Sequence, residues 1–420
     1  MNDKKNIWIL NHYATGMFIN CTGRHYALKK YLGEMGYNVT AFASNVYKDG
    51  SEEIEIKNFY EEKEYDGGKV VLVKSPAYKG NGAKRIKNML AFALNLYRCG
   101  LEYANYNKPD VILASSVHPF TLVAGLKIAK RLNIPCICEV RDLWPETFVE
   151  FGMIKRTSLI AKILYMGERW IYKKADQLIF TMPGGKDYII DKGWEKSIDL
   201  KKVHNANNGI DISVFNFNRD NYIIKDFDLK DKNTFKVVYA GSIRAANQVD
   251  VFVDIAAYYK EQNIKDIKFI IYGDGDHRER IEKRSQELEL DNIIFKGRVD
   301  NKYIANILSS GDLNIVTDKK NNLGHYGVSW NKLFEYMASG KPTIANYDMG
   351  KYNIIEENKI GVCKEFETIE DFAKEILRIK NMNESDYNEM CHNATEAANK
   401  YKYSNLAKDV DYIINLALNK

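Results

Sequence analysis

Residues 329–335, Ser-Trp-Asn-Lys-Leu-Phe-Glu, place groups that bind anions directly before a glutamate. The apolar residues 315–317 predict a strand, and residues 333–339 predict a short helix that stops at Gly340. The first N–H groups of a helix carry about +0.5 of an elementary charge and suit a phosphate. Glu335 lies one turn inside, where one carboxylate can accept both vicinal hydroxyls of a ribose. The residues expected at the phosphates are Ser329, Trp330, Asn331 and Lys332.

The alternative interpretation of this segment is a solvated helix glutamate and a surface lysine. Gly273-Asp274-Gly275-Asp276 also permits two interpretations, because Asp-x-Asp can bind a divalent metal between phosphates. The glycines, the preceding strand and the following helix favour a tight turn instead, with Asp276 near the helix N-cap. We therefore expect no metal. Gly297 and Arg298 follow the predicted strand 293–296, where backbone can read the edge of a base and Arg298 can equally be a surface group.

Polar residues follow strands in the first half of the chain as well. His118 lies at the carboxyl end of the predicted strand 111–116, although a lone histidine is usually structural. After the next strand, residues 139–146 read Glu-Val-Arg-Asp-Leu-Trp-Pro-Glu. Here Asp142 or Glu146 can bind a sugar hydroxyl and Trp144 can stack on a sugar ring. The alternative is a charged turn in which Arg141 pairs with Asp142.

These candidates need parallel strands to position them, and the sequence alternates strands and helices throughout. The predicted strands are 7–10, 38–44, 69–76, 111–116, 136–141, 177–181, 235–240, 268–272, 293–296, 312–317 and 343–346. The predicted helices include 23–35, 121–132, 158–174, 249–262, 277–290, 303–308, 333–339 and 404–419. Asn and Gly cluster at 203–215, and a polar insert is expected up to residue 233, so we place the domain boundary there. The prediction is one domain at 1–208 and a second at 209–401.

Composition agrees with a globular protein: 420 residues allow two or three domains, and a net charge of +5 is too mild to indicate nucleic-acid binding. The six cysteines are scattered without zinc-like spacing, which indicates a reduced, cytoplasmic protein. No apolar stretch approaches the roughly 18 residues of a membrane span, and the first apolar run is too short for a signal peptide.

The sequence from Glu335 to Pro342, Glu-Tyr-Met-Ala-Ser-Gly-Lys-Pro, resembles the nucleotide-sugar site of retaining glycosyltransferases of the GT-B fold, family 4. The segment is most similar to the branch written Ser-Pro-Asn-Lys-Leu-Phe-Glu-Tyr-Met, with Trp330 in place of proline. Arg-Asp-x-Trp-Pro-Glu at 141–146 resembles a motif of the bacterial polysaccharide branch. The resemblance implies two Rossmann-like, doubly wound α/β domains across a cleft, with the C-terminal helix 402–420 returning to the first domain.

The resemblance also implies residue roles. Family members place an arginine and a lysine after the first strand of the second domain, aimed at the leaving diphosphate. Here Gly241 and Ser242 begin this loop and Arg244 is the candidate arginine, whereas Asn247 stands where the lysine is usual. A first glutamate, expected to hold the donor sugar, is replaced by Gly327, and Lys332 is one source for the missing cation.

In the first domain, the resemblance implies that His118 approaches the donor sugar. It also implies that Arg141, Asp142, Trp144 and Glu146 lie near the acceptor. The glycine-rich loop after strand one corresponds to Gly16 and Gly23, although their spacing does not follow the usual pair.

We expect a glycosyltransferase that moves a sugar from a nucleoside diphosphate, with UDP favoured, to a hydroxyl of a lipid-linked saccharide. The family implies retention of configuration, no metal cofactor, and a place in the biosynthesis of capsule, O-antigen, lipopolysaccharide or exopolysaccharide. The alternatives are a nucleotide-sugar epimerase or hydrolase of the same fold, and a catalytically silent nucleotide-binding relative.

Residues 79–103 begin with basic residues and continue with an apolar stripe, Ile86, Leu90, Ala93, Tyr97 and Leu101. This pattern is typical of an interfacial helix and also of an ordinary wall helix in an α/β domain. Because Phe92 and Leu96 widen the apolar face, the sequence favours contact with the inner face of the cytoplasmic membrane.

Overall fold

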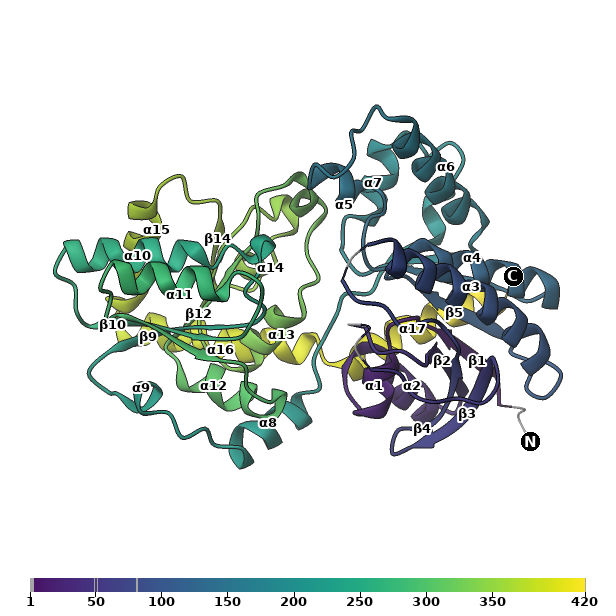
Figure 1. The fold of residues 1–420 in the computed structure, drawn as a ribbon, viewed down its shortest axis with the longest axis horizontal. Coiled ribbons are helices and arrows are strands. Elements are labelled where there is room, and N and C mark those ends of the chain that lie inside the picture. The colour runs from purple at the N-terminus through teal and green to yellow at the C-terminus, as the bar shows by residue number, and fades with distance from the viewer. Residues whose placement is uncertain (1–3, 49, 51, 81, 420) are drawn as a thin grey trace. The chain divides into compact units, whose positions relative to one another are not determined.

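The computed structural model describes residues 4–48, 50, 52–80 and 82–419. The chain forms two compact units, Met1–Asn208 together with Tyr403–Lys420, and Gly209–Lys402 (Figure 1). Each unit has a central sheet of mainly parallel strands with helices on both faces. This architecture confirms the predicted doubly wound α/β class.

The sheet of the first unit has the strand order β3-β4-β2-β1-β5-β6-β7-β8. All neighbours are parallel except β3, which pairs antiparallel with β4. Successive side chains of a strand point to opposite faces, so Ile7 packs in the cluster under helices α2 and α17 while Trp8 contacts Phe42 on the other face. The strands are β1 (Asn6–Leu10), β2 (Asn38–Ser44), β3 (Tyr60–Tyr65), β4 (Gly68–Val73), β5 (Val111–Ser115), β6 (Cys136–Val140), β7 (Gln177–Phe180) and β8 (Val203–Asn205).

Two helices from opposite ends of the chain cover one face of this sheet. In Figure 1 the yellow C-terminal helix α17 (Tyr403–Leu418) lies beside the purple helix α2 (Gly23–Glu34). Helices α3 (Ala83–Tyr103), α4 (Pro119–Leu132) and α6 (Leu159–Lys174) form a neighbouring series on the other face. The shorter helices of the unit are α1 (Thr15–Ile19), α5 (Glu146–Glu150), α7 (Gly185–Asp191) and η1 (Leu200–Lys202).

The sheet of the second unit is entirely parallel, with the order β11-β10-β9-β12-β13-β14. Val237 and Tyr239 of β9 pack toward α10, α11 and α15, whereas Val238 and Ala240 pack toward α12, α13 and α16. Figure 1 shows α10, α11 and α15 on one side of the strands and α8, α12 and α16 on the other. The strands are β9 (Phe235–Ala240), β10 (Ile267–Tyr272), β11 (Ile293–Gly297), β12 (Leu313–Thr317), β13 (Thr343–Asn346) and β14 (Gly361–Lys364).

The helices of the second unit are α8 (Ile212–Asn221), α9 (Phe227–Lys230), α10 (Asp250–Glu261), α11 (Arg278–Glu287), α12 (Ile304–Ser310), α13 (Asn331–Ala338), α14 (Ile354–Glu357), α15 (Ile369–Lys380) and α16 (Glu384–Lys400). Four 3₁₀ turns complete it: η2 (Ala245–Asn247), η3 (Asn301–Tyr303), η4 (Asn322–Tyr326) and η5 (Gly350–Tyr352).

The polar insert predicted up to residue 233 contains two helices that were not predicted from the sequence. It contains α8, whose Phe215 is buried, and α9, whose Leu229 is buried. Aspartate side chains accept a hydrogen bond from backbone N–H groups at the start of both helices: Asp211 from Val214, and Asp226 from Asp228. Each helix thus combines a side-chain cap with one buried apolar anchor.

Candidate functional site

The strand order of the second unit creates a topological switch point. From β9 the chain adds β10 and β11 on one side and then returns with β12 on the other side of β9. Open parallel sheets bind ligands at such a point, beyond the carboxyl ends of the diverging strands. The loop after β9 begins at Gly241, and Asp318 directly follows β12. Both segments therefore adjoin the switch point.

Lys332 of α13 extends its ammonium to the loop after β9. Its Nζ atom lies 3.4 Å from the hydroxyl of Tyr239 and 4.8 Å from the centre of that ring. With the Asn247 amide in the orientation that satisfies both of its atoms, Nζ donates to the amide oxygen over 3.3 Å, and the amide nitrogen donates to the carbonyl of Ser242. A Cβ at Gly241 would lie only 3.3 Å from Nζ, so glycine leaves room for this lysine. The ammonium of Lys332 therefore lies beside the side chain of Asn247.

Three ionisable groups at this switch point have perturbed pKa values. Burial raises the pKa of Asp318 to about 6 and that of Glu335 to about 7. Burial also lowers the pKa of Lys332 to about 8, against the attraction of Asp318 and Glu335. Among the described residues, no side chain bonds to the Glu335 carboxylate and no carboxylate forms an ion pair with Lys332. Half-buried, unpaired charges in one place are typical of a ligand site.

Helix α13 begins without a side-chain cap. Its N-cap residue, Trp330, makes no capping hydrogen bond, and its indole packs against Tyr347 with ring centres 5.0 Å apart. The first N–H groups of a helix have no intrahelical partner. The amides of Asn331 and Lys332 at the start of α13 are therefore suited to an anion.

The backbone explains why a glutamate is absent from position 327. Gly327 adopts φ 80° and ψ 175°, a conformation that is essentially restricted to glycine. A residue with a Cβ would be strained there. The loop that precedes α13 therefore follows a path that excludes the side chain seen in the resembling family.

The other residues predicted at the donor fall into two groups. Gly273 lies against Gly241, where a Cβ would approach the Gly241 carbonyl oxygen to 1.8 Å, so the Gly-Asp-Gly segment is a turn packed on the loop after β9. The N–H of Gly273 donates to the carbonyl of Gly297, which brings these two glycines together. Arg244 and Arg298 are exposed, and neither side chain bonds to another described residue.

In the first unit the switch point lies between β1 and β5, and it holds a pair of buried histidines. Nε2 of His118 lies 2.6 Å from Nδ1 of His12, and the His12 ring is stacked between Tyr13 and Phe92. Burial lowers the pKa of His118 to about 3, so the pair is neutral. Because His118 is fully buried, direct contact with a sugar would require this packing to open.

The predicted acceptor residues differ in their surroundings. Glu146 is buried and accepts hydrogen bonds from Arg156, Tyr165 and Lys192, which favours a structural role over binding of a sugar hydroxyl. Trp144 packs edge-on against Phe148, while Arg141 is half-buried and Asp142 exposed. Gly16 lies in α1 and Gly23 begins α2 with φ 77°.

Sequence reasoning missed a buried ionic network beside these residues. Glu139 of β6 accepts hydrogen bonds from Arg24, His25 and Ser115. Burial opposes its ionisation, but Arg24 and His25 outweigh burial and hold the pKa of Glu139 well below its usual range. Arg24 also donates to the carbonyls of Ala206 and Asn207, at the end of the first unit. Tyr239, Asp318 and His12 were missed too, although their positions at strand ends beside the switch points were a usable signal.

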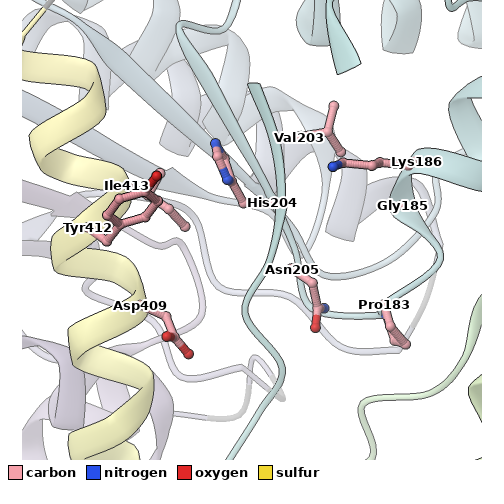
Figure 2. A pocket seen from close by; sticks show the side chains of 9 residues that line it. All are labelled: Pro183, Gly185, Lys186, Val203, His204, Asn205, Asp409, Tyr412 and Ile413. Atoms are coloured by element: carbon pink, nitrogen blue, oxygen red, sulfur yellow. The ribbon is translucent and has the colours of Figure 1, made fainter. Parts of the chain in front are cut away.

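A cavity of about 410 Å³ opens elsewhere in the first unit, between β8, α7 and α17 (Figure 2). Lys186, His204, Asp409 and Tyr412 are among its lining residues, and none of the predicted site residues lines it. Across the described ranges, no group of three or more His, Cys, Asp or Glu residues is arranged to hold a metal ion. In the same part of the chain, no helix has the length and apolar character needed to cross a membrane.

Two family models match the two halves of the chain. The model described as "Glycosyltransferase Family 4" matches residues 25–214, and the model described as "Glycosyl transferases group 1" matches residues 221–401. Together with the two doubly wound units, these matches show that the chain belongs to the glycosyltransferases of the GT-B fold class.

The individual proteins that resemble this chain share low sequence identity with it. The probable glycosyltransferase WbjE of Pseudomonas aeruginosa is 23% identical over 255 residues, which are 60% of this chain and 61% of WbjE. The chain thus matches less than two thirds of that relative. The structure of Anabaena Alr3699/HepE in complex with UDP superimposes with a TM-score of 0.68 at 12% identity, covering 98% of this chain and 99% of HepE. WaaG, a glycosyltransferase involved in lipopolysaccharide biosynthesis, gives 0.63 at 13% identity, covering 97% and 99%.

Proposed function

We propose that the chain transfers a sugar from a nucleoside diphosphate to a hydroxyl group of a saccharide. The observation that carries this proposal is the pair of half-buried, unpaired charges on α13, the ammonium of Lys332 and the carboxylate of Glu335. Both lie near an uncapped helix start at a switch point. A diphosphate joined to a ribose supplies the matching groups, two phosphates for the cation and amides and two hydroxyls for the carboxylate.

Lys332 and Arg244 are the proposed cations for the leaving diphosphate. Charge develops on this group as the glycosidic bond breaks, and fixed cations nearby stabilise it. Lys332 reaches Asn247, the position where related enzymes carry the loop lysine, and so provides the charge from the helix instead of the loop. The backbone of Gly241, Ser242, Gly273 and Gly297 forms the proposed wall for the phosphates and base, and Arg298 flanks it.

The nucleotide that we propose is uridine diphosphate, because HepE, which has the same fold, is described with UDP bound. We further propose that the reaction retains the anomeric configuration. The acceptor oxygen would bond to the anomeric carbon on the face that the diphosphate leaves, and the departing phosphate oxygen would take the hydroxyl proton. No protein carboxylate is needed as a general base in this scheme, and no metal is part of the proposal.

The acceptor that we propose is a lipid-linked saccharide in surface-polysaccharide assembly. Two observations support this finer proposal: the Arg-Asp-x-Trp-Pro-Glu motif at 141–146, and the fold shared with WaaG. Arg141, Asp142 and Trp144 remain the candidate acceptor contacts, since Glu146 is already bonded to three side chains of its own unit.

Calorimetric titration with UDP and with GDP tests the donor proposal. UDP should bind, and Glu335→Ala should raise the Kd for UDP about tenfold or more, because a charge-assisted pair of hydrogen bonds is lost. Glu367→Ala is the matched control, since Glu367 is an exposed glutamate of the same unit without a partner among the described residues. An unchanged Kd for Glu335→Ala contradicts the site. UDP binding without turnover on any acceptor would favour the silent relative, and rapid turnover of donor alone would favour a hydrolase or epimerase.

A further inference from the structure

We propose that helix α6 and the neighbouring surface of α4 dock on the anionic surface of a lipid bilayer. The observation behind this inference is that α6 exposes its large apolar side chains to solvent and buries a glutamate. Five large apolar side chains of α6 point to solvent: Leu159 (72% exposed), Ile160 (62%), Ile163 (57%), Met166 (71%) and Trp170 (41%). Their spacing follows the helical repeat of about 3.6 residues, so they form one stripe along the helix.

The buried face of α6 holds an ionisable residue, Glu168. Glu168 is buried and accepts hydrogen bonds from the hydroxyls of Tyr172 (2.7 Å) and Tyr188 (2.8 Å). Tyr172 itself packs edge-on against Phe180 of β7 and against Trp194. The inward face of α6 therefore packs against the first unit without using the five apolar residues of the stripe.

A wall helix in the second unit shows the usual arrangement. Helix α15 buries Phe372, Ala373, Ile376 and Ile379, and its exposed residues are Glu370, Asp371, Lys374 and Arg378. All four exposed side chains of α15 carry charge, whereas α6 exposes its largest apolar side chains. Contiguous apolar surface of this kind marks an interaction face.

The positive charge around the apolar stripe indicates a negatively charged partner. Between residues 152 and 174 the exposed charged residues are all basic: Lys155, Arg156, Lys162, Arg169, Lys173 and Lys174, of which Arg156 is already paired with Glu146 and Glu150. The one acid in this range is the buried Glu168. Helix α4, which packs beside α6, exposes only Lys127, Lys130 and Arg131. An apolar stripe flanked by lysine and arginine matches the interface of a bilayer that contains anionic lipid.

A second copy of the chain fits this surface less well. Two such faces brought together would oppose like charges, which disfavours association. The helix predicted from the sequence, α3, is also a weaker candidate. Phe92 and Leu96, which widened the apolar face in that prediction, are fully buried, so the large apolar side chains that α3 exposes are Ile86, Leu90 and Leu94, fewer than the five of α6. The inference concerns a different surface from the donor site and does not depend on the proposed donor chemistry.

Co-sedimentation of the full chain with vesicles tests the proposal. Vesicles of phosphatidylglycerol and phosphatidylethanolamine should bind the chain at least tenfold more strongly than vesicles of phosphatidylcholine, and added salt should weaken the binding. Ile163→Ser with Met166→Ser, and separately Lys162→Glu with Lys173→Glu, should each lower the partition coefficient at least tenfold. The matched control is Ile223→Ser with Phe227→Ser, which removes two exposed apolar side chains from the second unit and should change nothing.

UDP binding and circular dichroism report whether the variants are folded, which is expected because the substituted side chains are exposed. Vesicle binding that persists in both α6 variants overturns the proposal, whatever the effect of changes in α3. It is also overturned if sedimentation velocity shows a dimer that the Ile163 and Met166 changes dissociate while vesicle binding stays unchanged, since the stripe would then join two copies.

Discussion

The ammonium of Lys332 lies 3.3 Å from the amide oxygen of Asn247, so a lysine of helix α13 delivers its charge to the loop after β9. In the family that the sequence resembles, that loop provides its own lysine. The two arrangements put a cation in the same neighbourhood from different elements. Four predictions test this donor site and the fold that carries it.

Removing the Lys332 charge should weaken donor binding. Lys332→Met should raise the Kd for UDP-glucose by about 10- to 100-fold, because a hydrogen bond to a charged group contributes about 1.5–3 kcal/mol. Adding Asn247→Lys to this variant should recover part of the loss, since the new ammonium would start from the opposite side of the contact. Isothermal titration of the single and double variants gives the answer. Equal affinities for Lys332→Met and the unchanged chain would remove Lys332 from the site.

Donor affinity should pass through a maximum between about pH 7 and pH 8. The Glu335 carboxylate must be ionised to accept two hydroxyls, and its pKa of about 7 means that affinity falls as the pH drops below that value. Lys332, with a pKa of about 8, loses its charge at higher pH, so affinity falls again. UDP-glucose is the suitable probe because its diphosphate diester does not titrate in this range.

Two variants test whether Glu335 causes the acidic limb of that pH profile and Lys332 the alkaline limb. Glu335→Gln should lower affinity overall and flatten the acidic limb, and Lys332→Arg should move the alkaline limb to higher pH, because a guanidinium stays protonated. A pH-independent Kd for the unchanged chain, or an acidic limb that survives in Glu335→Gln, would contradict the assignment of these charges.

Placing the family glutamate at position 327 should lower the stability of the protein without improving donor affinity. Gly327→Glu places a side chain at φ 80° and ψ 175°, and the backbone strain should cost about 1–3 kcal/mol of stability. Thermal unfolding should therefore shift to lower temperature, and the affinity for UDP-glucose should fall or stay the same. A variant that binds the donor more tightly at unchanged stability would show that the loop can accommodate the glutamate after all.

Glu168 should make the stability of the first unit depend on pH. Burial raises its pKa to about 8, so the folded state favours the protonated form, and this stabilisation is lost as the pH rises from about 4.5 through 8. One pKa unit corresponds to about 1.4 kcal/mol. Relative to Glu168→Gln, the unchanged chain should therefore lose on the order of 3 kcal/mol between about pH 5 and pH 8. Urea unfolding at both pH values measures the difference, and parallel pH profiles would exclude the linkage.

Strand periodicity and helix signals were sufficient to predict the fold class. The strand Thr343–Asn346 was predicted with its observed bounds, and the elements around it differ by one or two residues. The strand β3 was missed because its sequence, Tyr-Glu-Glu-Lys-Glu-Tyr, is charged, and only its pairing with β4 keeps it extended. Helices α8 and α9 were missed because each has a single buried anchor.

The candidate site could be predicted only where local sequence determines it. The start of α13 and the position of Glu335 follow from local sequence, and the structure has both. The contact between Lys332 and Asn247 joins residues far apart in the sequence and depends on the packing of α13 beside β9. Likewise, the side of α6 that faces solvent follows from Glu168 bonding inward to Tyr188, which periodicity alone cannot show.

A crystal structure of the chain with UDP bound would test the central claim most directly. The account predicts ribose hydroxyls within hydrogen-bond distance of the Glu335 carboxylate, and a diphosphate against the first amides of α13 and Nζ of Lys332. A nucleotide bound elsewhere, for example in the cavity beside His204, with α13 unoccupied, would contradict it.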